Sequence, residues 1–518
     1  MIPVIDIFAG PGGLGEGFSS TLDPSGAPAF KIKLSLEKEA NAHSTLRLRA
    51  FFRQFFQNAV PDDYYRHLRG EISQQELFAL HSEAATRADQ EAVQLTLGEN
   101  TWSTTEGQIR RALNNAREWV LIGGPPCQAY SLVGRARNKG KKDYVPADDE
   151  RHFLYREYLR ILSTFHPSVF VMENVKGLLS SKPEGSPIFE QLMQDLKSPT
   201  SALYTSPSTR SNKAANYKLY SLAAESNDSE SYVLKSELYG VPQARHRVII
   251  VGVREDIAET VPTRLAICDP IPAKNVLYGL PAIRSGISRE TDSADAWISI
   301  IHDMSERRWY KTASNAEPLL GQYLDSAIRN ARRPRNDRGG EFVACEPAIA
   351  YRPDWFIDKR INGVCNHSSR AHITKDLYRY LYAACYAKAF GTSPRLRDFP
   401  PDLLPNHDNV SKAVEEGNLF EDRFRVQLSD RPSTTITSHI SKDGHYYIHP
   451  DPTQCRSLTV REAARLQTFP DNYFFTGPRT AQYTQVGNAV PPLMAAQIAQ
   501  RILELLQRSG ISGNGSSG

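Results

Sequence analysis

The stretch Trp119-Val-Leu-Ile-Gly-Gly-Pro-Pro-Cys127-Gln-Ala-Tyr-Ser131 is the best starting point for interpreting this chain. Its short apolar run is typical of a buried strand, which the glycines and prolines then end. Cys127 follows in a loop that the prolines stiffen, at the carboxyl end of the strand, where open α/β sheets bind ligands. A thiolate in such a place is a good nucleophile. Taken alone, the loop is explained equally well by a buried structural cysteine.

Length and composition indicate an ordinary globular protein of two to three domains. The chain has 518 residues, of which 40% are hydrophobic and 23% charged, and its net charge of +4 permits a polyanionic partner without requiring one. The six cysteines show no CxxC spacing, which argues against a disulfide framework. We see no signal peptide or membrane span and expect a soluble, intracellular protein. We expect no metal, because the spacing of Cys345, Cys365, His367 and His372 fits no standard zinc site.

A glycine-rich turn follows the first predicted strand, residues 4–8. Gly10, Gly12 and Gly15 match G-x-G-x-x-G, a pattern that sites for NAD, FAD and S-adenosylmethionine share and that some ligand-free turns also show. A second predicted strand, residues 31–37, ends at Glu37, which suits hydrogen bonds from ribose hydroxyls or the capping of a surface helix. A nucleoside-containing cofactor is therefore expected.

Residues 94–99 are predicted to form a third strand that ends at another acid. Glu99 at this end is able to accept a hydrogen bond from an adenine amino group. The preceding residues, about 39–93, have a helical and charged pattern, which predicts a helical insertion on the sheet. Its arginines either contact nucleic acid or belong to a solvated helix face.

Two further segments place polar groups near Cys127. Residues 167–175 are predicted to be a buried strand that ends with Glu173 and Asn174 at the carboxyl edge of the sheet, where Cys127 also lies. A carboxyl group at the end of a buried strand is costly unless it has a partner or a function. The alternative interpretation is that the Glu173 carboxylate only caps the next helix. In the segment from Gln243 to Arg247, strand alternation puts Gln243, Arg245 and Arg247 on one face, suited to an anion or a heterocycle edge or simply to solvent.

The remaining segments define the predicted domain plan. The alternation of strands and helices stops over residues 285–430. The segment is rich in arginine, asparagine, histidine and tyrosine, which is typical of contacts in a nucleic-acid groove, although an insertion domain without such a role would also fit. Thr459 and Glu462 form a capping-box signature for a helix over residues 459–467. An amphipathic helix through residue 506 and a Gly/Ser-rich tail follow. The predicted divisions are a catalytic domain over 1–284, a second, smaller loop-rich domain over 285–430, a returning segment over 431–508 and a disordered tail over 509–518.

Together these pieces closely resemble the cytosine-5 DNA methyltransferases. The family's ordered motifs stand here as Asp6-Ile-Phe-Ala-Gly-Pro-Gly-Gly13, Gly124-Pro-Pro-Cys127-Gln, Glu173-Asn-Val175, Gln243-Ala-Arg-His-Arg247, Arg461-Glu-Ala-Ala-Arg465 and Gly487-Asn488. The resemblance covers roughly residues 1–285 and 430–508, with a variable target-recognition segment between. It implies an α/β, Rossmann-like S-adenosylmethionine-dependent methyltransferase sheet and a second, loop-rich target-recognition domain.

The resemblance also implies a mechanism and a set of site residues. Cys127 would add to carbon 6 of cytosine while Glu173 hydrogen-bonds or protonates N3, and Arg245 and Arg247 would hold the base, which must be flipped out of the duplex. Carbon 5 would then take the methyl group of S-adenosylmethionine. The implied cofactor residues are Phe8, Gly10, Gly12, Leu14, Glu37, Glu99 and Asn488. Glu99 departs from the family's usual aspartate, which leaves its adenine contact open.

The resemblance implies double-stranded DNA as the partner, a monomeric enzyme in the bacterial cytoplasm, and a cognate restriction endonuclease that acts on the same site. A tRNA cytosine methyltransferase on the same fold is the nearest alternative, but those relatives lack a large recognition domain. A nonenzymatic DNA-binding regulator is disfavoured by the intact Cys127, Glu173 and Arg247. An NAD-linked oxidoreductase would leave the Pro-Pro-Cys loop unexplained.

Overall fold

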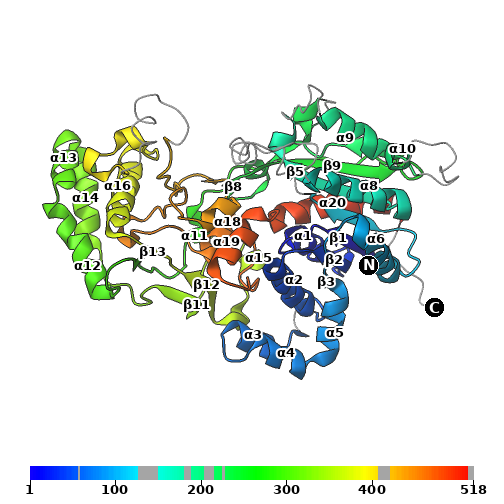
Figure 1. Ribbon diagram of the computed structural model, residues 1–518, viewed down its shortest axis with the longest axis horizontal. Helices are drawn as coiled ribbons and strands as arrows, with labels where there is room; N and C mark the ends of the chain where they lie inside the picture. The colour runs from blue at the N-terminus through cyan, green and yellow to red at the C-terminus, as the bar shows by residue number, and fades with distance from the viewer. Residues whose placement is uncertain are drawn as a thin grey trace. The chain divides into compact units, whose positions relative to one another are not determined.

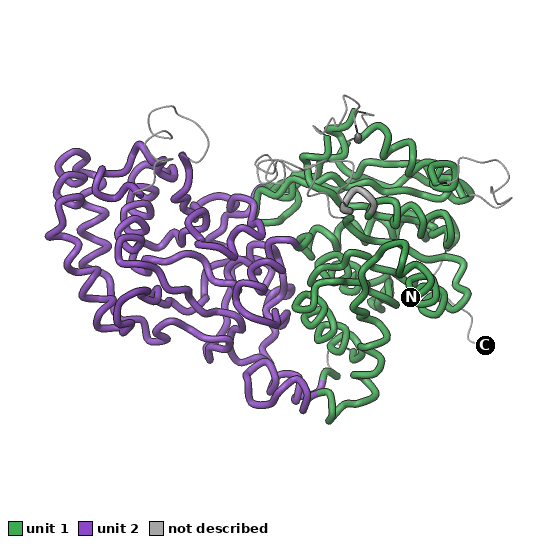
Figure 2. Tube along the Cα trace, viewed as in Figure 1, with its two compact units in different colours: residues 1–60, 78–269, 489–518 green, residues 61–77, 270–488 purple. Residues whose placement is uncertain are grey.

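The computed structural model describes residues 1–56, 59–125, 150–179, 188–203, 215–224, 228–405 and 421–511. The chain divides into two compact units (Figure 2). Unit 1 contains residues 1–60, 78–269 and 489–518, and unit 2 contains residues 61–77 and 270–488. Cys127 and the basic residues that follow it, Arg135 to Lys142, lie outside the described residues.

An eight-stranded mixed sheet forms the centre of unit 1 (Figure 1). Its order is β3-β2-β1-β4-β5-β9-β6, with β7 also paired to β9. The strands β1 to β5 pair in parallel, whereas β9 runs antiparallel to β5, β6 and β7. The strands are β1 (Ile2–Ile7), β2 (Phe30–Glu37), β3 (Ala92–Gln94), β4 (Val120–Gly123), β5 (Val169–Val175), β6 (Tyr217–Tyr220), β7 (Val233–Lys235) and β9 (His246–Arg254).

Helices cover both faces of this sheet. The helices of unit 1 include α1 (Gly13–Ser19), α2 (Ala40–Phe52), α5 (Ser82–Glu91), α6 (Trp102–Leu113), α8 (Glu150–Phe165), α9 (Ile188–Lys197), α10 (Pro199–Leu203) and α20 (Pro492–Arg508). Val120 and Ile122 pack into one core with α1 and α20, whereas Leu121 packs into a second core with α6, α8 and α9. Alternate residues of β4 thus enter opposite cores, as the period of a strand requires. The predicted α/β sheet, with helices on both faces, is confirmed.

Two details of the predicted strands are wrong. The third strand is β3, which ends at Gln94, and Glu99 instead begins the 3₁₀-helix η2 (Glu99–Thr101). The segment around Arg245 is not one continuous strand either. β8 (Gln243–Ala244) and β9 are separate because the Arg245 N–H donates hydrogen bonds to the Gln243 carbonyl and to Ser236 Oγ, each at 3.0 Å.

The predicted insertion over residues 39–93 is helical. It contains α2, α3 (Asp62–Leu68), α4 (Gln74–Leu80) and α5. Residues 61–77 of this insertion group with unit 2 and the rest with unit 1.

Unit 2 contains more helix than its composition suggested. Besides α3, its helices include α11 (Lys274–Leu277), α12 (Ala294–His302), α13 (Arg308–Ala316), α14 (Pro318–Asn330), α15 (Pro353–Phe356), α16 (Thr374–Phe390), α18 (Val460–Leu466) and α19 (Arg479–Asn488). Its strands are β10 (Gly286–Ile287), β11 (Gly339–Ala344), β12 (Gly363–Ser368), β13 (Ala371–His372) and β14 (Ser433–Thr434). Helices α12, α13, α14 and α16 share a core around Trp297, Trp309 and Tyr380. The capping box on α18 forms as predicted, since Thr459 and Glu462 exchange hydrogen bonds.

The compact units divide the chain differently from the predicted boundaries. The main segment of unit 2 begins at residue 270 and retains residues 431–488, so only the last part of the predicted returning segment groups with the sheet of unit 1. The assignment of catalytic and target-recognition roles to these parts stays a prediction. No helix among the described residues is long and apolar enough to cross a membrane.

Candidate active site

The backbone after β1 turns sharply through residues with positive φ. Phe8, Gly10 and Gly12 have φ angles of 54°, 58° and 95°. A Cβ atom added to Gly10 would meet no heavy atom within 4 Å. Gly10 therefore faces open space, and the lack of a side chain allows a ligand to approach the backbone closely.

Glu37 ties this turn to the end of β2. Its Oε2 accepts a hydrogen bond from the Gly10 N–H at 2.8 Å, and its Oε1 accepts one from the Glu39 N–H at 2.7 Å. An ionised carboxylate offers about four lone-pair positions, so two backbone donors leave capacity for ribose hydroxyls. The helix-cap interpretation of Glu37 is wrong, because Glu39 caps α2 by accepting a hydrogen bond from the Ala42 N–H at 2.7 Å. The Glu37 carboxylate holds the backbone and is half-buried beside the glycine turn.

Other residues of the same motif pack helices together instead of facing open space. A Cβ atom on Gly13 would lie 2.2 Å from the carbonyl oxygen of Val490, and one on Gly17 would lie 2.4 Å from the Cβ of Ala495. These glycines let α1 approach α20. The side chain of Leu14 is 6% exposed and belongs to the same core, so only its backbone is available to a cofactor.

Asp6 is a buried acid that the sequence analysis quoted only as part of a motif. It is completely buried on β1, and its Oδ2 would lie 3.0 Å from a Cβ atom at Gly15. Burial raises the pKa of Asp6 to about 8, with Glu37 adding to the rise and Arg53 opposing it. Asp6 therefore retains its proton near neutral pH. The available signal was an acid in the middle of an otherwise apolar strand.

A second group of polar residues stands where β4, β5 and β9 meet. Arg247 Nε lies 2.8 Å from Glu173 Oε1, and the two side chains are only 13% and 14% exposed. Burial lowers the pKa of Arg247, and the Glu173 carboxylate opposes that shift. A Cβ atom on Gly124 would lie 2.7 Å from Glu173 Oε2. The glycine after β4 thus makes room for this carboxylate.

Asn174 links the end of β5 to the segment that leads into the Cys127 loop. Its Nδ2 donates to the carbonyl of Pro125 at 3.3 Å, and its Oδ1 accepts from the Val175 N–H at 2.8 Å. The side chain is buried. Sequence reasoning placed Asn174 at this edge, and the structure adds its partner.

The remaining predicted residues differ in their exposure and surroundings. Arg245 is 1% exposed in unit 1, so a solvent-facing position is excluded for it. Glu99 is exposed. Its charge adds to the rise in the pKa of Glu157, so Glu99 lies near α8, the helix that carries Glu157. Asn488 is exposed at the end of α19 in unit 2, whereas the glycine turn belongs to unit 1. The cofactor roles of Glu99 and Asn488 stay predictions.

The histidines considered for a metal site have other partners in unit 2. His367 contacts Thr459 Oγ1 at 3.0 Å and the Pro281 carbonyl at 2.8 Å, and His372 contacts Ser457 Oγ at 3.2 Å. Within the described residues, no group of three or more His, Cys, Asp or Glu side chains is arranged to hold a metal ion.

The family model and the curated relatives indicate the same family. The family model for C-5 cytosine-specific DNA methylase matches residues 81–504. The type II methyltransferase M.Bpa9945I of Bacillus paralicheniformis is 33% identical over 97% of this chain and 99% of its own length. The DNA (cytosine-5-)-methyltransferase M.ApeKI of Aeropyrum pernix is 26% identical over 75% of this chain and 81% of its own length. A crystal structure of a putative DNA modification methyltransferase from an E. coli prophage covers 98% of this chain and 100% of its own at 18% identity, with a TM-score of 0.49.

Proposed function

The chain belongs to the C-5 cytosine-specific DNA methylases, and on that premise we propose that it methylates carbon 5 of cytosine within one specific double-stranded DNA sequence, with S-adenosylmethionine as the methyl donor. The observation that carries the proposal is the half-buried Glu173–Arg247 pair, which stands at the strand edge that leads into the Cys127 loop.

The residues around Gly10 fit the proposed cofactor. The open space at Gly10 admits a close ligand, and the Glu37 carboxylate beside it is able to accept the ribose hydroxyls. The half-buried ring of Phe8 would cover the adenine. S-adenosylmethionine would supply an electrophilic methyl group through its sulfonium.

The chain's own residues would make the cytosine ring reactive. The Cys127 thiolate adds to carbon 6, and Glu173 hydrogen-bonds or protonates N3, so that electron density moves to carbon 5. Carbon 5 would then take the methyl group, whose bond to the sulfonium sulfur would break and leave a neutral thioether. Loss of the carbon 5 proton to a base and breaking of the carbon 6–sulfur bond, with the electron pair returning to the Cys127 thiolate, would restore the ring. Arg247 orients Glu173 through their ion pair, and Arg245 helps to hold the base. The reacting carbon lies within the base stack, so the cytosine must be flipped out at a cost of a few kcal/mol.

The relatives' names support a biological role. Several are type II methyltransferases, so we infer that this enzyme belongs to a restriction–modification system, in which its methylation protects DNA from an endonuclease acting on the same sequence. Bisulfite sequencing of host DNA with and without the protein identifies both the site and the modified base. Methylation at no cytosine, or at another atom, overturns the proposal.

A trapping experiment tests the nucleophile. Duplex DNA of mixed sequence in which 5-fluorocytosine replaces cytosine retains the covalent enzyme complex, because fluorine does not leave as a proton does. With S-adenosylmethionine, the wild-type protein should form an adduct that survives denaturing electrophoresis. Cys127→Ser should abolish it, whereas Cys268→Ser, at an exposed cysteine, should not. Persistence of the adduct in Cys127→Ser would assign the nucleophile to another residue.

A further inference from the structure

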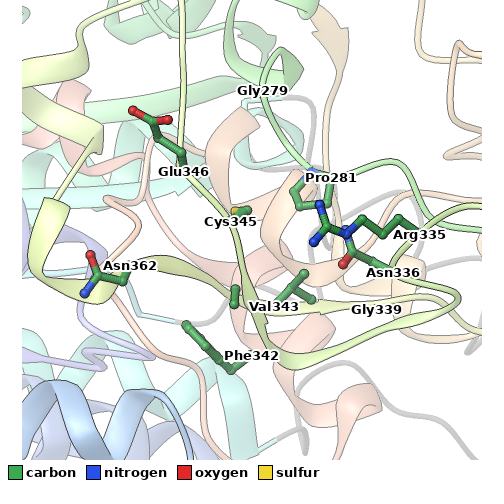
Figure 3. A pocket seen from close by; sticks show the side chains of 11 residues that line it. Gly279, Pro281, Arg335, Asn336, Gly339, Phe342, Val343, Cys345, Glu346 and Asn362 are labelled. Carbon is green, nitrogen blue, oxygen red and sulfur yellow. The ribbon is translucent and has the colours of Figure 1, made fainter.

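A cleft with a volume of about 800 Å³ lies in unit 2 beside the antiparallel strands β11 and β12 (Figure 3). Arg335 and Asn336 line it together with Pro281, Phe342 and Glu346. Figure 3 shows Arg335 and Asn336 next to each other beside Pro281, with Cys345 and Glu346 further along the cleft. The lining thus combines hydrogen-bond donors, acceptors and an aromatic ring.

Buried groups hold one wall of this cleft in place. Arg465 Nη1 donates to the carbonyls of Val276, Tyr278 and Ala348 at 3.1, 3.3 and 3.2 Å. The Arg465 Nη2 is in turn paired with Asp471 at 2.7 Å. Gly279 has a φ of 79°, and a Cβ atom there would lie 2.4 Å from the Ala348 carbonyl oxygen. This wall therefore needs both the arginine and the glycine, and it forms a rigid support for the lining side chains.

Arg335 differs from the other arginines of the basic run 329–338. Arg329 lies 3.8 Å from Asp325, Arg338 lies 2.9 Å from Asp292, and Arg333 pairs with Asp295. Arg332 donates to the carbonyl of Ala331 at 2.7 Å.

The exposed Arg335 side chain has no hydrogen bond or ion pair with any described residue. It is the member of this run whose donors remain available to a ligand in the cleft. The carboxylate of Glu346 and the amide of Asn336 are likewise without a partner among the described residues.

We propose that Arg335 reads a guanine in the major groove and that the recognised DNA sequence therefore contains a guanine on which methylation depends. The inference rests on the proposed function. A guanidinium donates two parallel hydrogen bonds to O6 and N7 of guanine, the most common specific contact between a side chain and a base. The neighbouring Asn336 amide offers both a donor and an acceptor to the adjoining base edge. The Arg335 guanidinium has no acidic partner among the described residues, and its positive charge would also attract the DNA phosphates.

The sequence preference of Arg335 variants tests this assignment. The wild type, Arg335→Ala, Arg335→Lys and Arg329→Ala are each given a duplex library with randomised positions around cytosine, and the methylated molecules are identified by bisulfite sequencing. Arg329 is the matched control, because it is 76% exposed, belongs to the same run and does not line the cleft.

In Arg335→Ala, the preference for guanine at one position should fall about tenfold or more, while the other positions are unchanged. Arg335→Lys should retain part of the preference, and Arg329→Ala should match the wild type. Uniformly weaker methylation with an unchanged sequence preference and a shallower salt dependence would show a phosphate contact and overturn the assignment. If the wild type methylates no cytosine, the proposed function itself fails, whereas an unaltered preference in an active Arg335→Ala refutes only this inference.

Discussion

The Glu173–Arg247 pair gives the sharpest test of how the candidate site is held together. Both side chains are about one-seventh exposed, and the paired atoms lie 2.8 Å apart on the adjacent strands β5 and β9. Glu173→Gln leaves the guanidinium buried without its counter-charge. Breaking a buried pair in this way costs about 3–5 kcal/mol, because the remaining charge keeps its desolvation penalty.

A double-mutant cycle separates this cost from other effects of the substitutions. Arg247→Met should destabilise the site by a similar amount, since it leaves the carboxylate alone. The double variant Glu173→Gln/Arg247→Met removes both charges and should therefore cost clearly less than the sum, with a coupling energy of about 2 kcal/mol or more. The exposed pair of Arg110 and Glu106, four residues apart on α6, is the control and should couple by less than about 0.5 kcal/mol.

Hydrogen exchange resolved to β9 provides the measurement, because it reports the opening free energy of this part of the sheet without requiring the whole chain to unfold in one step. Turnover is uninformative here, since Glu173 is also the proposed acid. Additive effects of the two substitutions on β9 would refute the argument that the pair is energetically coupled.

Three further perturbations concern the support of the glycine turn. Glu16→Gln should destabilise unit 1 by about 3 kcal/mol in denaturant unfolding, because Arg49 Nε donates to Glu16 at 2.8 Å and both side chains are buried; an effect below 1 kcal/mol would contradict this. Asp6 keeps its proton in the folded protein up to a pKa of about 8, against 3.8 when unfolded, so stability should fall as pH rises between these values by at most about 1.4 kcal/mol per unit. Asp6→Asn should remove that slope in unfolding curves between pH 5 and 8.5, and an unchanged slope would assign it to another group. Gly13→Ala should destabilise by more than about 2 kcal/mol, since its Cβ meets the Val490 carbonyl at 2.2 Å, and a near-neutral result would show that α20 shifts easily.

The elements that the sequence predicted well are those whose signals are local. The capping box of Thr459 and Glu462 needs only residues three apart, and α18 begins where this signature predicts. The strand that ends at Glu37 likewise shows its apolar alternation within eight residues. Such signals survive folding because neighbouring residues create them and later packing reinforces them.

The predictions that failed depended on contacts from elsewhere in the chain. Strand alternation put Arg245 on the face shared by Gln243 and Arg247, but the Ser236 hydroxyl takes the Arg245 N–H and interrupts the strand. The apolar residues before Glu99 suggested a longer strand, whereas Leu97 enters the core from the segment after β3. No pattern within either segment reveals these alternatives.

The glycine motif illustrates why motif matching overstates a binding site. Gly10 faces open space, but Gly13 and Gly17 are required because α20 lies against α1. The residues that demand them, Val490 and Ala495, stand more than four hundred positions later in the chain. A sequence pattern therefore records two separate requirements, close approach by a ligand and close approach by a helix, and only the structure assigns each glycine to one of them.

The adjacent residues Glu173 and Asn174 divide two tasks that the proposed reaction needs. Side chains of consecutive strand residues point to opposite sides, so the pair is able to act in two directions from one backbone position. Glu173 engages Arg247, whereas Asn174 holds the Pro125 carbonyl two residues before Cys127. The hydrogen bond from Asn174 therefore attaches Pro125, two residues before Cys127, to the strand that carries Glu173. An acid and a nucleophile that act on opposite sides of one ring, at N3 and at carbon 6, need a common support, and the Asn174 amide connects the two segments that carry them.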